Sequence, residues 1–346
     1  MRKKICWLIC AFLGWLWAVQ SCTTTPVAKA FRFKEKLSDY GFFEGNLRSL
    51  RPKAGVLPYY LATPLFTDYT LKDRFIVLPA DSAMRYKGAG LLEFPDSTFI
   101  IKNFAYLNSR QEKVMIETRL LFRDPADHQW KVMNYLWDST QQDARQWILG
   151  KKIPITLLDD SGAAHTTVYQ MPNTNDCKRC HINNSVLTPI GPKARNLNHD
   201  AGKGNQLQQW AKLQKLAGLP DISAVAKLPD WQDSVNYSVK ERARAYLDVN
   251  CAHCHTHGGD AYNTGLFLEY EQQNENHLGF MKSPVSAGGG AGGLDYDIVP
   301  GDALHSILAY RMNSTVPGTA MPELARTVIH KEGVALVSRW INEMKR

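Results

Sequence analysis

Two copies of one cysteine pattern constrain this chain more than any other feature. Beyond residue 22 its only cysteines are Cys177, Cys180, Cys251 and Cys254. They form two C-x-x-C pairs, each followed at once by histidine, in CKRCH (177–181) and CAHCH (251–255). An exported chain could join four cysteines into two structural disulfides. A C-x-x-C disulfide, however, is normally catalytic and needs a thioredoxin-like strand–helix frame, which neither segment predicts.

C-x-x-C-H is also the spacing at which haem c is attached, with two thiols for the vinyl groups and a histidine for the iron. The surroundings of the second motif favour this interpretation. A helix is predicted over 239–250, directly before it, and a second apolar helix over 330–346. Between them, Met321 precedes Pro322 in a stretch predicted to be extended. We therefore expect Cys251 and Cys254 as tethers, with His255 and Met321 as iron ligands.

A structural zinc site is the alternative for the second motif. It would use Cys251, Cys254 and two of the histidines at 253, 255 and 257. His253 lies inside the C-x-x-C turn and is expected to point away from a shared metal. The side chains of the adjacent Cys254 and His255 diverge, which suits a tetrahedral ion poorly. His253 and His257 are therefore interpreted as exposed polar residues of a loop.

The first motif has less regular surroundings. Its segment, MPNTNDCKRCH (171–181), has no predicted helix before the cysteines, because Pro172 and two asparagines indicate a turn. Cys177 and Cys180 are the expected tethers and His181 the proximal ligand of a first iron. The sequence does not decide the sixth ligand of this first iron, and an iron that is open or ligated by water is a further alternative. The candidates for the sixth ligand are His199, His330, Met312 and Met171.

The N-terminus predicts export. Three basic residues precede an apolar run over 5–19 that is too short for a confident membrane span. VQSC (19–22) resembles a lipobox, which predicts a signal peptide over 1–21, lipidation at Cys22 and a periplasm-facing lipoprotein. Thr23 in place of aspartate favours the outer membrane over the inner one. Removing 1–21 takes three positive charges from the net +8 and leaves +5; with no dense basic run, nucleic-acid binding is not expected.

The expected fold class is α+β. Between residues 40 and 171, short runs rich in β-branched and aromatic residues alternate with turn clusters, which predicts an antiparallel β-sandwich-like domain. A tether over 22–39 precedes it. A first haem-binding segment (172–230) and a class I cytochrome c domain (231–346) follow, and this region is expected to be mostly α-helical. The runs that predict strands are 73–79, 97–107, 113–124, 130–137, 151–160 and 166–171; helices are predicted over 205–219, 239–250, 302–313 and 330–346.

Residues 236–346 resemble a class I cytochrome c domain in the order helix, C-x-x-C-H, Met-Pro loop, helix. Roughly residues 40–346 resemble a family of dihaem c-type cytochromes of bacterial lipoproteins. The segments that carry this similarity are TPLFTDYTLKDRFIVLP (63–79), IETRLLFRD (116–124), GPKARNLN (191–198) and RARAYLDVNCAHCH (242–255). The resemblance implies two covalently bound haem c groups and redox protein partners. It also implies that the carbonyl of Pro192 accepts the Nδ1–H of His181.

These expectations lead to three function hypotheses. The first is a membrane-anchored carrier that transfers single electrons between redox proteins, without catalysis of its own. The second is a dihaem peroxidase-like enzyme with an open first haem, which needs a distal acid–base residue; Glu112, Glu117 and Gln170 are candidates by residue type. The third is a non-redox binding lipoprotein with zinc-stabilised loops.

Overall fold

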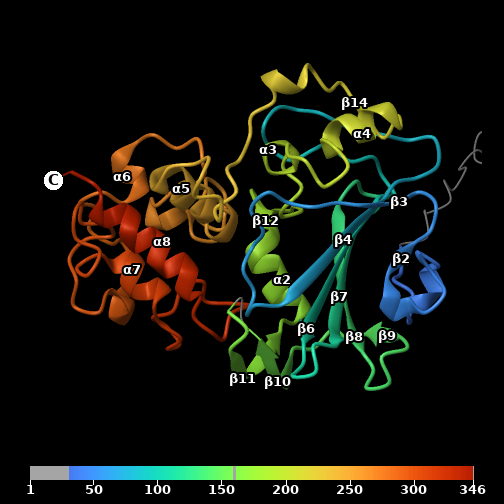
Figure 1. The fold of residues 1–346 in the computed structure, drawn as a ribbon, viewed down its shortest axis with the longest axis horizontal. Helices are drawn as coiled ribbons and strands as arrows, with labels where there is room; N and C mark the ends of the chain where they lie inside the picture. The colour runs from blue at the N-terminus through green and yellow to red at the C-terminus, as the bar shows by residue number, and fades with distance from the viewer. Residues whose placement is uncertain (1–30, 159–160, 346) are drawn as a thin grey trace, which may run out of the picture. The chain divides into compact units, whose positions relative to one another are not determined.

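The computed structural model describes residues 31–158 and 161–345 (Figure 1). The predicted signal peptide, Cys22 and residues 22–30 of the predicted tether lie outside these ranges. Residues Phe33–Arg346 form one compact unit. Within the described ranges, no helix has the length and apolar character needed to cross a bilayer.

A six-stranded sheet is the largest element, with antiparallel pairing throughout and the strand order β3-β4-β6-β7-β8-β9. Its strands are β3 (Val56–Pro58), β4 (Leu71–Val77), β6 (Phe99–Leu107), β7 (Lys113–Arg123), β8 (Trp130–Trp137) and β9 (Ala144–Gln146). Four two-stranded pairs accompany it: β1–β2 (Phe43–Glu44, Arg51–Pro52), β10–β11 (Lys151–Leu158, Ala164–Met171), β12–β13 (Ile182–Asn183, Val186–Leu187) and β5–β14 (Met84–Arg85, Leu216–Ala217). All six strand runs expected from the sequence are thus confirmed, with ends that differ by up to two residues.

Alternation along the strands gives this sheet two different faces. Phe75, Ile101 and Leu120 pack on one face with the N-terminal residues Leu37 and Phe43. On the other face, the row of Ile76, Ile100 and Leu121 joins a second cluster. The other members of that cluster come partly from segments before the first motif, such as Tyr59 and Phe94, and partly from the helical segment after it, including Leu197, Leu207 and Trp210. The sheet therefore has one face on a core of its own and the other toward the cysteine motifs.

Seven α-helices are present among the described residues, and none exceeds twelve residues. They are α2 (Thr174–His181), α3 (Ala194–Leu197), α4 (Gln206–Lys212), α5 (Val239–Asn250), α6 (Glu275–Leu278), α7 (Ile307–Met312) and α8 (Lys331–Asn342). The predictions over 239–250 and 330–346 are confirmed by α5 and α8. The predictions over 205–219 and 302–313 are too long, since α4 and α7 cover only seven and six residues. The helix α2, which contains the first motif, was not predicted.

The predicted fold class is wrong. A single six-stranded antiparallel sheet with small hairpins replaces the expected sandwich, and residues 172–346 are not mostly helical. The physical reason lies in the glycines between the second motif and α7. Many of them have the positive φ that glycine tolerates and that a right-handed helix cannot contain, so the chain turns repeatedly. The domain boundaries after residues 171 and 230 stay predictions.

Helices α5 and α8 pack against each other and form the core of the C-terminal region. Tyr246 and Leu247 of α5 share one cluster with Val337, Trp340 and Ile341 of α8. A capping box fixes the start of α5: the side chain of Ser238 accepts from the Glu241 amide, and the Glu241 carboxylate accepts from the Ser238 amide. Figure 1 shows α5–α8 grouped together, with α2 between them and the six-stranded sheet.

A buried ion pair joins α5 to the segment that follows the first motif. Asp248 of α5 accepts from the Arg195 guanidinium of α3 at 2.6 Å and from Lys193 Nζ at 3.2 Å. The side chains of Asp248 and Arg195 are 1% and 6% exposed. Burial alone would raise the pKa of Asp248, but Lys193 and Arg195 outweigh it and lower the pKa. The pair therefore stays ionised and holds the two segments together.

We predict that Asp248→Asn costs about 3 kcal/mol of stability, because it removes the buried carboxylate that pairs with Arg195 and leaves Glu271, which is 53% exposed, as the remaining ion-pair partner. The measurement is urea unfolding of the full chain. Glu343→Gln is the matched control, since it removes only the exposed pair with Arg339; it should cost no more than about 0.5 kcal/mol. Equal losses in the two variants would contradict the role given to Asp248.

Candidate cysteine–histidine site

The first motif lies on the short helix α2, which begins at a capping box. The side chain of Asn173 accepts from the amides of Asn175 and Asp176, and Asp176 accepts from the Asn173 amide at 3.0 Å. Strand β8 fixes the helix in place: Asn134 Nδ2 donates to the Pro172 carbonyl at 2.7 Å, and its Oδ1 lies 3.8 Å from Cys177 Sγ. Cys177 and Cys180 are thus held at the boundary between the sheet and the C-terminal helices.

The second motif begins where α5 ends, and its turn is hydrogen-bonded to the segment directly after the first motif. The Asn184 amide donates to the Gly258 carbonyl at 2.9 Å, and Asn183 Nδ2 donates to the His257 carbonyl at 2.9 Å. Gly258 has a φ of +75°, and a Cβ there would lie 2.3 Å from Asn184 Oδ1. This close approach of the two segments requires glycine.

Both motifs line one cavity of about 400 Å³. All four cysteines are outside disulfides. The expected tethers and ligands that line this cavity are Cys177, Cys180, His181, Cys251, Cys254, His255 and Met321. Residues 74 positions apart in the sequence are therefore brought to a common space.

His181 is held in one tautomer. Its Nδ1 lies 2.8 Å from the Thr188 carbonyl, which can only accept, so Nδ1 carries the proton and Nε2 keeps a lone pair. Burial, together with the charge of Lys102, lowers the pKa of His181 to about 3, against the opposing effect of this hydrogen bond. The ring is neutral at pH 7, which is the form that binds a metal.

The acceptor for His181 is thus Thr188, and the prediction of Pro192 in that role is wrong. The Pro192 carbonyl instead accepts from the Leu92 amide at 3.3 Å, because the chain at Pro192 and Lys193 pairs with the segment at Leu91 and Leu92. The second histidine, His255, has a weaker partner in Thr264 Oγ1 at 3.5 Å. Burial lowers its pKa to about 4.

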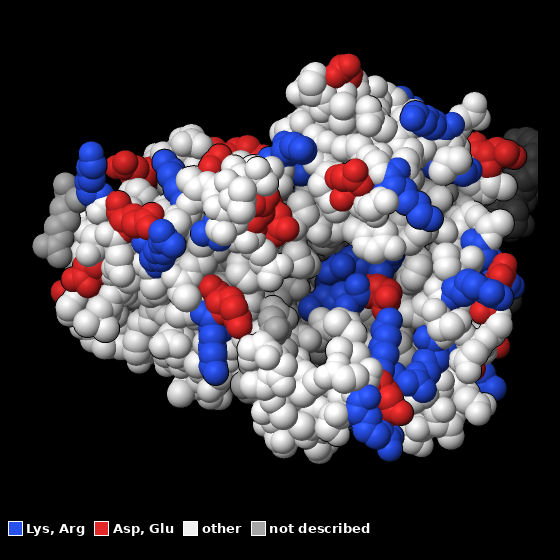
Figure 2. Space-filling view, in the orientation of Figure 1, with Lys and Arg blue, Asp and Glu red and all other residues white. Residues whose placement is uncertain are grey.

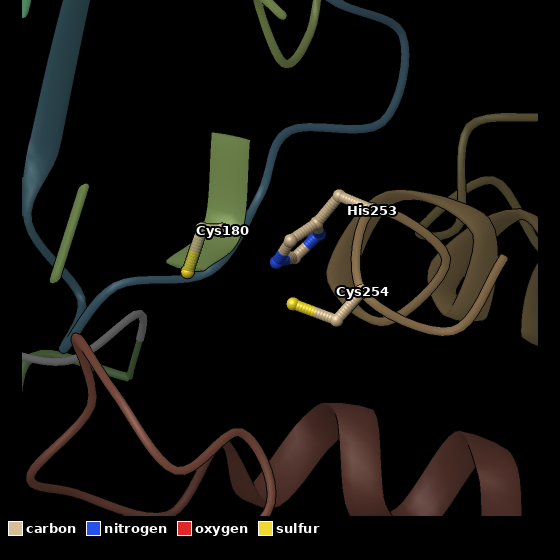
Figure 3. Close-up of side chains that lie close together, drawn as sticks. All are labelled: Cys180, His253 and Cys254. Carbon is tan, nitrogen blue, oxygen red and sulfur yellow. The ribbon is translucent and has the colours of Figure 1, made fainter. Parts of the chain in front are cut away.

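Cys180 and Cys254 come together with His253 (Figure 3), and their ligand atoms all lie within 4.8 Å of one another. The expectation of an exposed His253 is wrong: its ring points toward the cysteines, and its Nδ1 is buried with no hydrogen-bond partner. The hydrogen bond with Cys254 lowers the pKa of Cys180 to about 5 and raises that of Cys254. His257 is exposed, as expected, and its ring lies tilted against the Phe267 ring, with the centroids 4.0 Å apart.

The four candidates for the sixth ligand of the first iron lie at different distances from the cavity. Met312 lines the main cavity, whereas His330 lies beside it in a small pocket that also contains Met312 and Met321. His199 is directed elsewhere, with Nε2 3.1 Å from the Tyr60 carbonyl and Nδ1 3.0 Å from that of Asp200. Met171 is fully buried in a separate apolar cluster. Of the four, only Met312 lines the space shared by the two motifs.

Met321 lies in a loop that is fastened to the β-rich region through Asp68. The Asp68 carboxylate accepts from the Thr327 amide at 2.7 Å, the Thr327 hydroxyl at 2.8 Å and the Val328 amide at 3.0 Å. Tyr69 donates to Glu332 Oε2 at 2.7 Å. Asp68 and Tyr69 have φ values of 47° and 53°, a conformation that costs non-glycine residues about 1–3 kcal/mol each. The contacts to residues 327–332 outweigh this strain and fix the end of the loop.

Comparison of the chain with family models, with curated proteins and with solved structures gives no match. The assignment of a function therefore rests on the geometry of the site itself.

We predict that Asp68→Ala removes the fastening of the loop, because alanine has no side-chain oxygen to accept from the Thr327 and Val328 amides. Hydrogen exchange of these two amides should be about tenfold faster or more, which corresponds to a loss of at least about 1.4 kcal/mol of local stability. Asp81→Ala is the control, since it also places alanine at a positive φ (53°) but at an exposed position. Unchanged exchange at both amides in Asp68→Ala would show that Asp68 does not hold the loop.

Proposed function

We propose that the chain is an extracytoplasmic dihaem c-type cytochrome, attached to the membrane by a lipid at Cys22, that transfers single electrons between redox proteins. The observation that carries the proposal is the cavity shared by the two C-x-x-C-H motifs. Its volume lies in the range of cofactor sites, its cysteines are outside disulfides, and its two motif histidines are neutral. The residues present therefore fit the group.

Each residue has a defined task in this proposal. Cys177 with Cys180 and Cys251 with Cys254 would hold the two groups through thioether bonds, and His181 and His255 would each provide a nitrogen ligand to an iron. The Thr188 carbonyl keeps the proton on Nδ1 of His181 and leaves Nε2 available. When bound, haem supplies a one-electron couple at its iron.

The protein brings the two haem-binding motifs close together, buries them and orients their ligands. The sulfurs of Cys180 and Cys254 lie within 4.8 Å of each other, so the two attachment points are neighbours. Met321 would provide a thioether ligand to the second iron, which raises a reduction potential relative to a second histidine. The fastening of its loop by Asp68 keeps this sulfur at the cavity.

Covalent attachment is tested by mass spectrometry of the chain exported in a host that matures c-type cytochromes. We expect the mass of the mature chain plus two haem groups. The double variant Cys177→Ala/Cys180→Ala should keep one haem, and Cys251→Ala/Cys254→Ala should keep the other. An unmodified mass together with one bound zinc per chain would instead favour a metal-stabilised binding lipoprotein, for which Cys180, His253 and Cys254 offer three ligands.

A peroxidase-like enzyme is the second candidate function, because only one of the four sixth-ligand candidates lines the cavity. Visible and electron paramagnetic resonance spectra separate the two functions. A carrier should show two low-spin irons, whereas an open first iron should be high-spin and the reduced protein should turn over peroxide. Met321→Ala provides a reference, since removal of the thioether should make the second iron high-spin and lower its potential.

Of the residues named from the sequence as candidates for the distal acid–base group of a peroxidase, Glu117 is fully buried, and its carboxylate is hydrogen-bonded by Arg119 and Tyr169.

A further inference from the structure

Three cations lie side by side on the sheet face that borders the cavity. Arg74 of β4 is directly opposite Lys102 of β6, and Lys102 is directly opposite Arg119 of β7. The next residue in this row, opposite Arg119, is Asn134, the β8 residue that contacts Cys177. The row of cations thus leads across the sheet to the first motif.

Like charges directly opposite each other in a sheet are destabilising, and burial increases the cost. Lys102 and Arg119 both line the cavity and both lie over the Phe104 ring, at 5.1 and 4.3 Å from its centroid. Lys102 is partly buried and Arg74 is only 9% exposed. Burial, together with the charges of Arg74 and Arg119, lowers the pKa of Lys102 well below its ordinary value.

The carboxylates nearby do not neutralise this row. Glu117 binds Arg119, yet the Arg119 Nε is buried without a partner. In the described part of the chain the Lys102 ammonium group makes no hydrogen bond or ion pair, and the Arg74 guanidinium makes only a long hydrogen bond of 3.4 Å to the Lys72 carbonyl. One row therefore contains three cations and a single bound carboxylate.

The acidic residues that line the cavity are already engaged. Asp260 and Glu323 both accept from Arg179, at 3.1 and 3.2 Å. Asp297 pairs with Lys282 at 3.6 Å, and Asp176 closes the capping box of α2. None of these four carboxylates contacts the row of cations. They therefore do not balance its positive charge, and an additional anion could do so.

We propose that Lys102 and Arg119, supported by Arg74, form an anion-binding wall of the cavity, which holds a carboxylate or a group of like charge. Two sources share this chemistry: the carboxylates of a haem attached at Cys177 and Cys180, or a free inorganic anion. The first source rests on the proposed function, and the second does not. In either case the anion restores the charge balance that the sheet register alone does not provide.

The test uses Lys102→Gln in the full chain, because Lys102 has no partner that this change would leave unpaired. In the haem-loaded protein, a redox titration should show one of the two couples shifted to lower potential and the other unchanged. Loss of one nearby positive charge should change the reduction equilibrium constant on the order of tenfold, which for one electron is about 59 mV. Lys102→Arg should restore the value, and the exposed Lys227→Gln should leave both couples unchanged.

A titration with inorganic phosphate distinguishes the two sources of the bound anion. If a haem carboxylate is held by the row, phosphate leaves the wild-type potentials unchanged while Lys102→Gln still shifts one couple. If the anion is free, phosphate shifts one wild-type couple in a saturable way, and Lys102→Gln abolishes the response. The proposal is overturned if Lys102→Gln behaves like Lys227→Gln in both the redox and the phosphate titrations.

The anion-binding wall can be tested even if the proposed function is wrong. If mass spectrometry finds no haem, the melting temperature of the same chain is measured at increasing phosphate concentrations. An anion wall predicts a rise in melting temperature with phosphate in the wild type and in Lys227→Gln, and none in Lys102→Gln. The same rise in all three proteins, or no rise in any, would overturn the proposal in the haem-free chain.

Discussion

The ion pair between Asp248 and Arg195 links the parts of the molecule on which the site depends. Arg195 belongs to α3 and lies fourteen residues after His181, the last residue of the first motif, and Asp248 lies one turn before Cys251. Lys193 Nζ and the Tyr270 amide also donate hydrogen bonds to the Asp248 carboxylate. Because both partners are almost fully buried, separation of the two segments would leave charges without compensation, which costs far more than the loss of a surface pair.

This pair and the contact of Asn184 with Gly258 place the two motifs on one cavity, while the Asp68 contacts add Met321 from the opposite side. Each of these connections joins segments far apart in the chain and uses a buried polar group with several partners. Such connections give little stability beyond that of apolar packing, but they define one arrangement, because alternatives leave a buried group unsatisfied. The site is therefore built by directional contacts between chain segments, on top of two separate apolar cores.

Local sequence patterns predicted the local structure well. The β-branched and aromatic runs of β6 and β7 and the apolar positions of α5 and α8 each act within a few residues, so the sequence shows them directly. The predicted helicity of the region after Cys251 is too high, because α7 begins only at Ile307 and residues 302–306 do not join it. A short helix at the first motif was missed, although Asn173 and Asp176 have the spacing of a capping box.

Long-range relations were not predictable in the same way. The approach of Cys180 to Cys254, the choice of Thr188 over Pro192, and the inward position of His253 depend on how segments pack rather than on spacing. The row of Arg74, Lys102 and Arg119 is the clearest case. Each cation lies next to one apolar residue and one polar residue of its strand, as in many half-exposed strands, and the accumulation of charge appears only when the strand register is known.

That register makes the two halves of the cavity electrostatically unequal. Lys102 and Arg119 act on the first motif, where both add to the effect of burial and lower the pKa of His181. At the second motif, burial and the charge of Arg311 lower the pKa of His255, and Cys251 packs against the apolar cluster of α5 and α8. Under the proposed function, two chemically identical groups would therefore differ in potential for two reasons: a different set of nearby cations at each motif and a thioether ligand at the second. Both effects raise a potential, so their difference, and with it the direction of electron transfer between the sites, depends on how completely an anion neutralises the cationic row.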